Sequence, residues 1–278
     1  MLYLADVGWS RVRVVRIATD GSEQQVRHDD AQESMEGVLE QLTERLSELG
    51  CTSGARVAVA WNGVVADGCV TASGRGREEV GLRLREALKA DVRVWNDAHA
   101  AGWGVVGDHA AREAVVAVIG SSLGRAFITN GAVIETPGAG ELLSVQGCSC
   151  GEERCITTMP GGVRFARHVA RVSGKDRTNG ELRLAWDAQD EDVRESFKQL
   201  WARVRVSVFE PAVLTSSETV FIGGTFGTAW FEVFQQLWEH DAEDLRSGGG
   251  HVPLCVELGS EPVLRGLSSL VRDDDRWM

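Results

Sequence analysis

Residues 2–18 have the sequence LYLADVGWSRVRVVRIA, in which two apolar stretches flank a short turn. Leu2 to Asp6 and Arg11 to Ala18 are predicted to form strands, joined by the turn Val7-Gly8-Trp9-Ser10. The second stretch alternates loosely between apolar and arginine side chains, which is the pattern of a half-buried strand. The chain is therefore expected to open with a β-hairpin.

The elements after this hairpin alternate between helices and strands. Residues 34–49 place apolar side chains at helical spacing and are followed by Gly50, which predicts an amphipathic helix closed by a glycine. A strand over 56–61, a helix over 78–88 and a strand over 92–96 follow. This order is typical of an α/β layer architecture.

A second round of elements echoes the first. Strands over 114–119 and 126–129 flank the turn Gly120 to Gly124, and the repetition predicts two related lobes. We expect residues 1–97 with about 258–278 in the first lobe and residues 98–257 in the second. The remaining elements expected are helices over 162–172, 193–208, 229–238 and 262–271 and strands over 219–222 and 254–257.

Length, composition and charge exclude several classes of protein. The chain has 278 residues, 43% of them hydrophobic and 25% charged, which suits two ordinary domains and excludes a wholly disordered or collagenous chain. The net charge of −12 argues against a nucleic-acid-binding surface, but backbone N–H groups hold phosphates in proteins of any net charge. The sequence shows neither a membrane-spanning apolar run nor a signal-peptide pattern, so we expect a cytoplasmic protein.

Three strand ends carry glycine where a backbone would approach a ligand closely, at Gly8, Gly120 and Gly223-Gly224. Each alone favours a structural role, but together they favour a nucleotide held between two lobes. Asn96 and Asp97 follow another apolar strand, where open α/β sheets place ligand-contacting residues. Asp97 would be either a helix N-cap or a base that accepts a proton from an alcohol attacking a phosphoryl group.

Three of the six cysteines, Cys148, Cys150 and Cys155, lie within eight positions. This spacing suits one tetrahedral zinc ion that lacks a fourth ligand, and the alternative is three reduced thiols in a tight loop. Among the nine tryptophans, Trp9 in the first turn is the one for which a cleft position is favoured over the core.

Taken together, these motifs resemble the ROK family of sugar kinases and repressors, members of the actin-like, hexokinase-like ATPase superfamily. The resemblance covers nearly the whole chain and implies a two-lobed, actin-like (ribonuclease H-like) α/β fold with a duplicated mixed sheet and a central cleft. The motifs occur in the family's order as Asp6-x-Gly8-x-Ser10, Asn96-Asp97-Ala98, Gly120 to Gly124, Gly138-Ala139-Gly140-Glu141, the cysteine loop, Phe209-Glu210-Pro211 and Val220 to Gly224.

The resemblance implies ATP-dependent phosphorylation of a hexose or amino-sugar hydroxyl by a homodimer, with Asp97 as general base. Asp6 would orient Mg²⁺ through water, and the cysteine loop would hold a structural Zn²⁺. The substrate-binding positions implied are Asn62, Gly63, Asn96, Glu141, Ser144 and Thr157. The nucleotide-binding positions implied are Asp6, Gly8, Ser10, Gly120, Ser121, Gly124, Gly223 and Gly224.

The sequence departs from the family pattern at these same sites. Trp9 stands where the family has glycine, and Arg125 after the second turn would add a cation near phosphate. Ser144 replaces a histidine that contacts sugar and zinc, and Thr157 replaces a glutamate. These departures imply an altered substrate and leave a second hypothesis, a non-catalytic sugar- or nucleotide-sensing protein.

Overall fold

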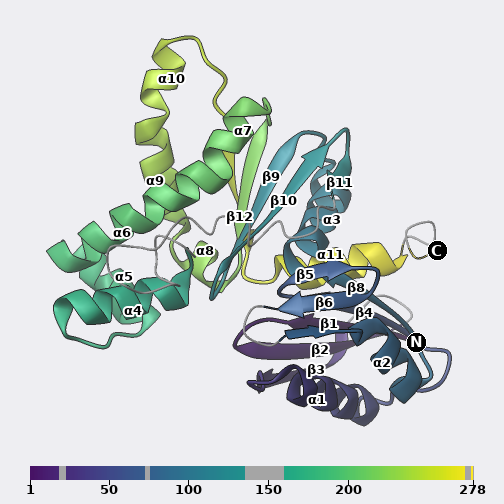
Figure 1. Ribbon diagram of the computed structural model, residues 1–278. Coiled ribbons are helices and arrows are strands. Elements are labelled where there is room, and N and C mark those ends of the chain that lie inside the picture. Colours follow the sequence, from purple (N-terminus) through teal and green to yellow (C-terminus); the bar gives the residue numbers. More distant parts are fainter. Residues whose placement is uncertain (19–22, 73–75, 135–159, 273–276, 278) are drawn as a thin grey trace. The chain divides into compact units, whose positions relative to one another are not determined.

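The computed structural model describes the chain except residues 19–22, 73–75, 135–159, 273–276 and 278 (Figure 1). The chain divides into two compact units, Met1–Ala110 with Val133–Glu141 and Val263–Met278, and Ala111–Ala132 with Leu142–Pro262. Each unit contains a five-stranded mixed sheet, which confirms the predicted α/β class. The lobe division predicted at residue 97 stays a prediction.

The first sheet has the strand order β3-β2-β1-β4-β8. β1 (Leu2–Val7) and β2 (Arg11–Ile17) form the predicted hairpin, and β4 (Arg56–Trp61) and β8 (Asp91–Asn96) continue the sheet as parallel strands. β3 (Glu23–Asp30) pairs with β2 at the other edge. The sequence analysis missed β3 because its residues EQQVRHDD are almost all polar.

Helices cover both faces of this sheet (Figure 1). α1 (Met35–Glu48) and α2 (Val80–Leu88) bury their apolar sides in one core with β1 and β4. α3 (Asp97–His109) and α11 (Pro262–Arg272) lie on the opposite face. A small antiparallel sheet that was not predicted joins β4 to α2 and consists of β5 (Val64–Ala66), β6 (Cys69–Ala72) and β7 (Gly76–Glu78).

α3 and α11 approach each other backbone to backbone. A Cβ atom built on Gly266 of α11 would lie 1.6 Å from the carbonyl oxygen of Ala100, and one on Gly104 of α3 would lie 3.0 Å from the Cα of Gly266. Real Cβ atoms essentially never lie within 3.0 Å of another heavy atom, and the contact at Gly104 is at that limit. The two helices therefore need glycine at their crossing point.

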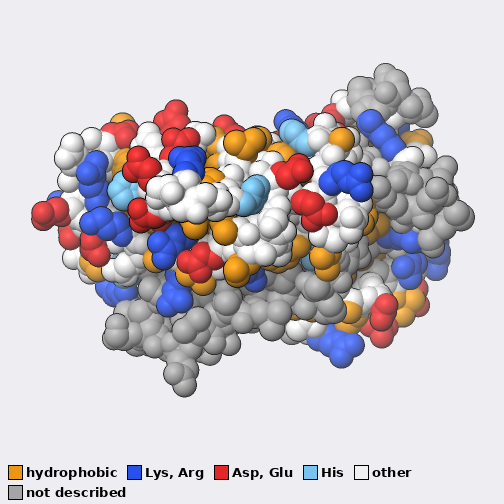
Figure 2. Space-filling view, turned by 90° about the horizontal axis from the view of Figure 1, so that it is seen from above, with side chains coloured by type: hydrophobic (Ala, Val, Ile, Leu, Met, Phe, Trp, Pro, Cys, Tyr) orange, Lys and Arg blue, Asp and Glu red, His pale blue; other side chains and the backbone are white. Residues whose placement is uncertain are grey.

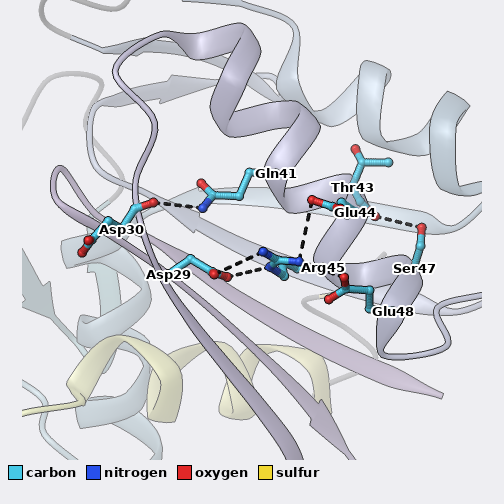
Figure 3. Close-up of polar contacts among 8 residues, drawn as sticks. All are labelled: Asp29, Asp30, Gln41, Thr43, Glu44, Arg45, Ser47 and Glu48. Atoms are coloured by element: carbon cyan, nitrogen blue, oxygen red, sulfur yellow. Dashed lines mark hydrogen bonds and ion pairs between the residues drawn. The ribbon is translucent and has the colours of Figure 1, made fainter.

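Polar contacts tie α1 to the edge strand β3 (Figure 3). Arg45 Nε donates to Asp29 Oδ2 at 2.8 Å, and Gln41 Nε2 donates to the carbonyl oxygen of Asp30 at 2.9 Å. Hydrogen bonding to Asp29 raises the pKa of the Arg45 guanidinium. These contacts hold the polar strand β3 where apolar side chains are scarce.

The second sheet has the order β11-β10-β9-β12-β13. β10 (Leu123–Thr129) begins three residues earlier than predicted, so the turn after β9 (Ala114–Ile119) is confined to Gly120–Ser122. The other strands are β11 (Ala132–Ile134), β12 (Thr219–Gly223) and β13 (Leu254–Gly259).

The helices of the second unit enclose an aromatic core in which Trp201, Trp230 and Trp238 are buried, as predicted. The range expected as a single helix, 193–208, covers most of the α-helix Glu191–Val204 and of the π-helix Arg205–Phe209, which follows it directly. The helices are α4 (Gly162–Ser173), α5 (Asn179–Asp187), α6 (Glu191–Val204), η1 (Arg205–Phe209), α7 (Glu210–Leu214), α8 (Thr225–Ala229), α9 (Phe231–Asp241) and α10 (Glu243–Ser247).

Candidate functional site

The candidate site in the first unit lies at the carboxyl ends of three parallel strands. Val7, Trp61 and Asn96 occupy the same level of β1, β4 and β8. The residues that follow them therefore leave the sheet at one edge, and the Asn62 N–H donates to the Val7 carbonyl oxygen at 2.9 Å. This register places the predicted residues Asp6, Gly8, Asn62, Gly63, Asn96 and Asp97 along that edge.

Asn96 is the N-cap of α3. Its Oδ1 accepts hydrogen bonds from the backbone N–H groups of Ala98 and His99 at 3.0 and 3.1 Å, and its Nδ2 donates to the Gly63 carbonyl oxygen at 2.8 Å. The alternative prediction that Asp97 is the cap is therefore wrong, because Asn96 already has the extended backbone that a cap requires. Asn96 fastens the end of β4 to the start of α3.

Asp97 is the first residue of α3, and its carboxyl group is buried, with 8% of the residue exposed. Its Oδ2 accepts a hydrogen bond from Asn62 Nδ2 at 2.8 Å, and its Oδ1 accepts one from the Ala98 N–H at 2.8 Å. Burial raises the pKa of Asp97, and these hydrogen bonds oppose that effect without cancelling it. A buried carboxylate with a raised pKa at a strand end is the pattern of a general base.

The first turn is tightly folded around Gly8. Its N–H donates to the Arg11 carbonyl oxygen at 2.9 Å, and a Cβ at Gly8 would lie 3.3 Å from that oxygen. Ser10 is exposed, and its carbonyl oxygen accepts from the Ala31 N–H at 3.0 Å. Trp9 is partly exposed, so it is not part of the described core.

The turn after β9 in the second unit is fastened to α4. The Gly120 N–H donates to Ser122 O at 3.0 Å, and the Gly162 N–H donates to Gly120 O at 2.8 Å. A Cβ at Gly161 would lie 2.5 Å from Ser121 O. Gly161 and Gly162 therefore shape this turn, although the sequence analysis did not select them; the pair Gly-Gly at a helix start is the signal that would have found them.

The predicted nucleotide-side glycines differ in their surroundings. A Cβ at Gly120 would meet no heavy atom within 4 Å, whereas one at Gly224 would lie 2.8 Å from Ile119 O, and Gly224 has a φ of +85°. A Cβ at Gly223 would lie 2.9 Å from Pro262 Cγ. Packing within the second unit therefore explains Gly223 and Gly224, while Gly120 leaves open space beside the turn.

Arg125 contacts the π-helix. Its Nη1 donates to the Ser207 carbonyl oxygen at 2.9 Å, and burial lowers the pKa of its guanidinium. Pro211, four positions after Ser207, has no N–H to donate to this carbonyl oxygen, so Arg125 supplies a donor in its place. This bond joins Arg125 to η1, and its expected place near phosphate stays a prediction.

Several predicted residues lie outside the described part of the chain: Glu141, Ser144, Cys148, Cys150, Cys155 and Thr157. Among the residues that are described, no group of three or more His, Cys, Asp or Glu side chains is placed to hold a metal ion. None of the described helices has the length and apolar character needed to span a membrane.

Two mixed five-stranded sheets in a duplicated α/β arrangement, with Asn-Asp at the end of a parallel strand, define an actin-like fold. The sequence model of the ROK family matches residues 6–245, and the chain belongs to the ROK family. The comparison with curated protein sequences gives no significant match.

Solved structures of this family have the same fold. A ROK family glucokinase from Streptomyces griseus, solved with glucose and AMPPNP, is 17% identical, with 98% of this chain and 99% of that chain covered and a TM-score of 0.76. A ROK hexokinase from Thermus thermophilus is 18% identical, with 99% of both chains covered and a TM-score of 0.70. A ROK family transcriptional regulator, a homolog of the E. coli MLC protein, is 16% identical, with 96% of this chain and 77% of that chain covered and a TM-score of 0.71. At these identities the likeness shows the fold.

Proposed function

We propose that this chain transfers the γ-phosphoryl group of ATP to a sugar hydroxyl, with Asp97 as the general base. The observation that carries the proposal is the Asp97 carboxylate, which is buried, held by Asn62 and located directly after β8. Membership of the ROK family and the glucokinase solved with glucose and AMPPNP support the choice of substrates. The acceptor class is a hexose or an amino sugar.

In this proposal Asp97 takes the proton of the sugar hydroxyl as its oxygen attacks the γ-phosphorus. The new O–P bond forms while the bond between the γ-phosphorus and the bridging oxygen breaks, and ADP leaves. Burial raises the pKa of Asp97, so the carboxylate is a stronger base than an exposed one. The hydrogen bond from Asn62 holds Oδ2 and directs the carboxylate.

Each of the two turns is, within its own unit, a candidate phosphate-binding turn. The open space at Gly120 fits the close approach of a phosphate, and Gly8 and Ser10 belong to the corresponding first turn. Because the Gly120 N–H already donates to Ser122 O, donors would come from the residues that follow Gly120. Asp6, at the end of β1, would hold Mg²⁺ through water, and this ion neutralises phosphate charge in such reactions.

An ADP-release assay with ATP, Mg²⁺ and a panel of hexoses and amino sugars tests the proposal. We expect Asp97→Asn to lower turnover by about 10²- to 10⁴-fold, because the general base is lost. Asp108→Asn is the matched control, since Asp108 lies at the exposed end of the same helix. Sugar-dependent ADP release that is the same in Asp97→Asn and wild type would contradict the assignment.

A second candidate is a non-catalytic sensor of sugar or nucleotide. The partly exposed Trp9 in the first turn favours it, because an indole beside the turn occupies volume that the family's glycine leaves open. The ROK transcriptional regulator shows that regulators share this fold. Sugar binding measured by calorimetry, without ADP release from any sugar of the panel, would favour the sensor over the kinase.

A further inference from the structure

A cavity of about 830 Å³ lies beside β8 in the first unit. Its walls come from β8, the β5–β6 hairpin and helices α2, α3 and α11. Pockets of about 300–1,000 Å³ are the usual size for small-molecule sites. β8 is the last strand of its sheet, so its outer edge is available to form one wall. Asp97 is not among the described residues that line the cavity, which is therefore distinct from the candidate base.

One wall of the cavity is formed by flat ring systems. Trp95 comes from β8, and His99 and Trp103 come from α3, where they are four residues apart and so lie on the same side of the helix. A tryptophan offers a broad apolar face and a polar N–H edge. Such a wall suits a ring that has an apolar face and polar groups around its rim.

The charged groups of the cavity balance one another. Arg85 and Arg93 contribute two positive charges, and Asp67 and Asp91 contribute two negative charges. Asp91 Oδ2 already accepts from Trp277 Nε1, and the Arg93 guanidinium lies over the Trp277 ring, so both groups are held in place. Arg85 is oriented by a hydrogen bond from its Nε to the Val92 carbonyl oxygen at 2.9 Å. Guanidinium groups donate and carboxylates accept, so the lining offers both kinds of partner without a net charge. A neutral ligand with many hydroxyl groups matches this balance better than an anion or a cation does.

We propose that the cavity binds a neutral polyhydroxylated ring, a sugar ring other than the one at Asp97. This proposal rests on the proposed function for its link to the phosphoryl acceptor. Asn96 lines the cavity and directly precedes Asp97, so the second ring of a disaccharide acceptor would have a place beside the base. Alternatively, the ring in the cavity would be a free sugar that binds separately from the acceptor, because a free sugar has the same chemistry.

Calorimetric titration of the intact protein without nucleotide tests the proposal, with glucose, N-acetylglucosamine, maltose and cellobiose as probes. We expect Trp103→Leu and Arg85→Lys each to weaken binding roughly two- to tenfold, since one removes the ring face and the other the planar guanidinium. The matched control is Arg83→Lys, which makes the same change on the same helix at a residue that pairs with Glu36 instead. This control should bind as the wild type does.

The two sources give different results. If the ring belongs to the acceptor, a disaccharide binds at one site and more tightly than glucose, and both cavity variants remove this advantage. If the ring is a free sugar, a monosaccharide binds at two sites and the cavity variants lose one of them. Both results support the cavity as a sugar site.

The proposal is overturned if no probe binds, or if all probes bind equally to wild type, Trp103→Leu and Arg85→Lys. Arg85→Lys keeps the test valid if Trp103→Leu fails to fold. The same titrations on Asp97→Asn separate this proposal from the kinase assignment. Cavity-dependent binding without ADP release contradicts only the kinase, and ADP release without cavity-dependent binding contradicts only the cavity site.

Discussion

Replacing Gly266 by alanine is expected to separate α11 from α3 and to destabilise the first unit. The added Cβ would lie 1.6 Å from Ala100 O, while ordinary contact begins at 3.4 Å. The helices must therefore move apart by about 1.8 Å, because the clashing atoms belong to backbone and cannot rotate away. α3 begins at Asp97, so the same movement disturbs the candidate base.

The size of the effect follows from the contacts that α11 would lose. Val263, Leu264, Leu267 and Leu270 are buried, and a gap of even 1 Å removes up to about half of the dispersion energy of a contact. We expect a cost of about 4 kcal/mol for this separation. Alanine has a higher helix propensity than glycine by about 1 kcal/mol, which leaves a net loss of about 3 kcal/mol. In a unit of this size, that corresponds to a fall in Tm of roughly 6–12 °C.

Differential scanning calorimetry of three further Gly→Ala variants provides the comparison. A Cβ at Gly107 would meet the flexible Ser269 hydroxyl at 2.7 Å, so Gly107→Ala should cost less, and adding Ser269→Ala should relieve it. Gly104→Ala should fall between Gly107→Ala and Gly266→Ala. Gly180 of α5 has open space around its Cβ position, so Gly180→Ala should raise stability by up to about 1 kcal/mol. A Tm for Gly266→Ala equal to or above that of the wild type would refute the reasoning.

Three other perturbations follow from contacts and motifs already described. Burial raises the pKa of Asp97 in the folded protein above its ordinary value of 3.8. The folded protein is therefore most stable when Asp97 is neutral, at pH values below 3.8, and it loses this stability as the pH rises through the raised pKa. Asp97→Asn should therefore melt above wild type at pH 8 and close to it at pH 3.5 in a thermal scan; a wild type that is more stable at pH 8 would contradict this. Trp277 is 3% exposed and donates from Nε1 to Asp91 Oδ2. Replacing Trp277 by alanine should lower the free energy of unfolding, measured in urea, by about 3 kcal/mol, and replacing it by phenylalanine should lower it less. Metal analysis of protein purified without chelator should find about one zinc per chain, lost when the cysteines at 148–155 are replaced by serine, and metal-free protein would contradict the zinc site.

The sequence predicted those elements whose apolar pattern is local. The alternation in residues 11–18 was enough for the opening hairpin, and the apolar run before Asn96 was enough to place Asn96 and Asp97 at a strand end. β3 has a single apolar residue and owes its place to pairing with β2, so no local pattern could reveal it. α5 was not predicted either, although its sequence contains a local helix signal: Thr178 and Glu181 form a capping box.

Contacts between distant residues were beyond the reach of sequence patterns. Which of Asn96 and Asp97 caps α3 depends on Asn62 and Gly63, which are more than thirty residues away. The cavity beside β8 likewise depends on side chains from α2, α3 and α11. The sequence around Gly266 does not indicate that a glycine is required there, because the atoms that exclude a side chain belong to the backbone of the distant residue Ala100.

The packing of α11 on α3 has a consequence for synthesis of the chain on the ribosome. One of the two helices on this face of the first unit, α11, is missing until residues 263–272 have emerged, and by then the whole of the second unit has already been made. Trp277 and Asp91, which bond to each other, are 186 positions apart in the sequence. Folding of an amino-terminal unit usually precedes that of later domains during synthesis, but here the apolar surface of the nascent first unit must wait for the last helix. That surface, which includes the Gly104 face of α3, is where a chaperone would be needed longest.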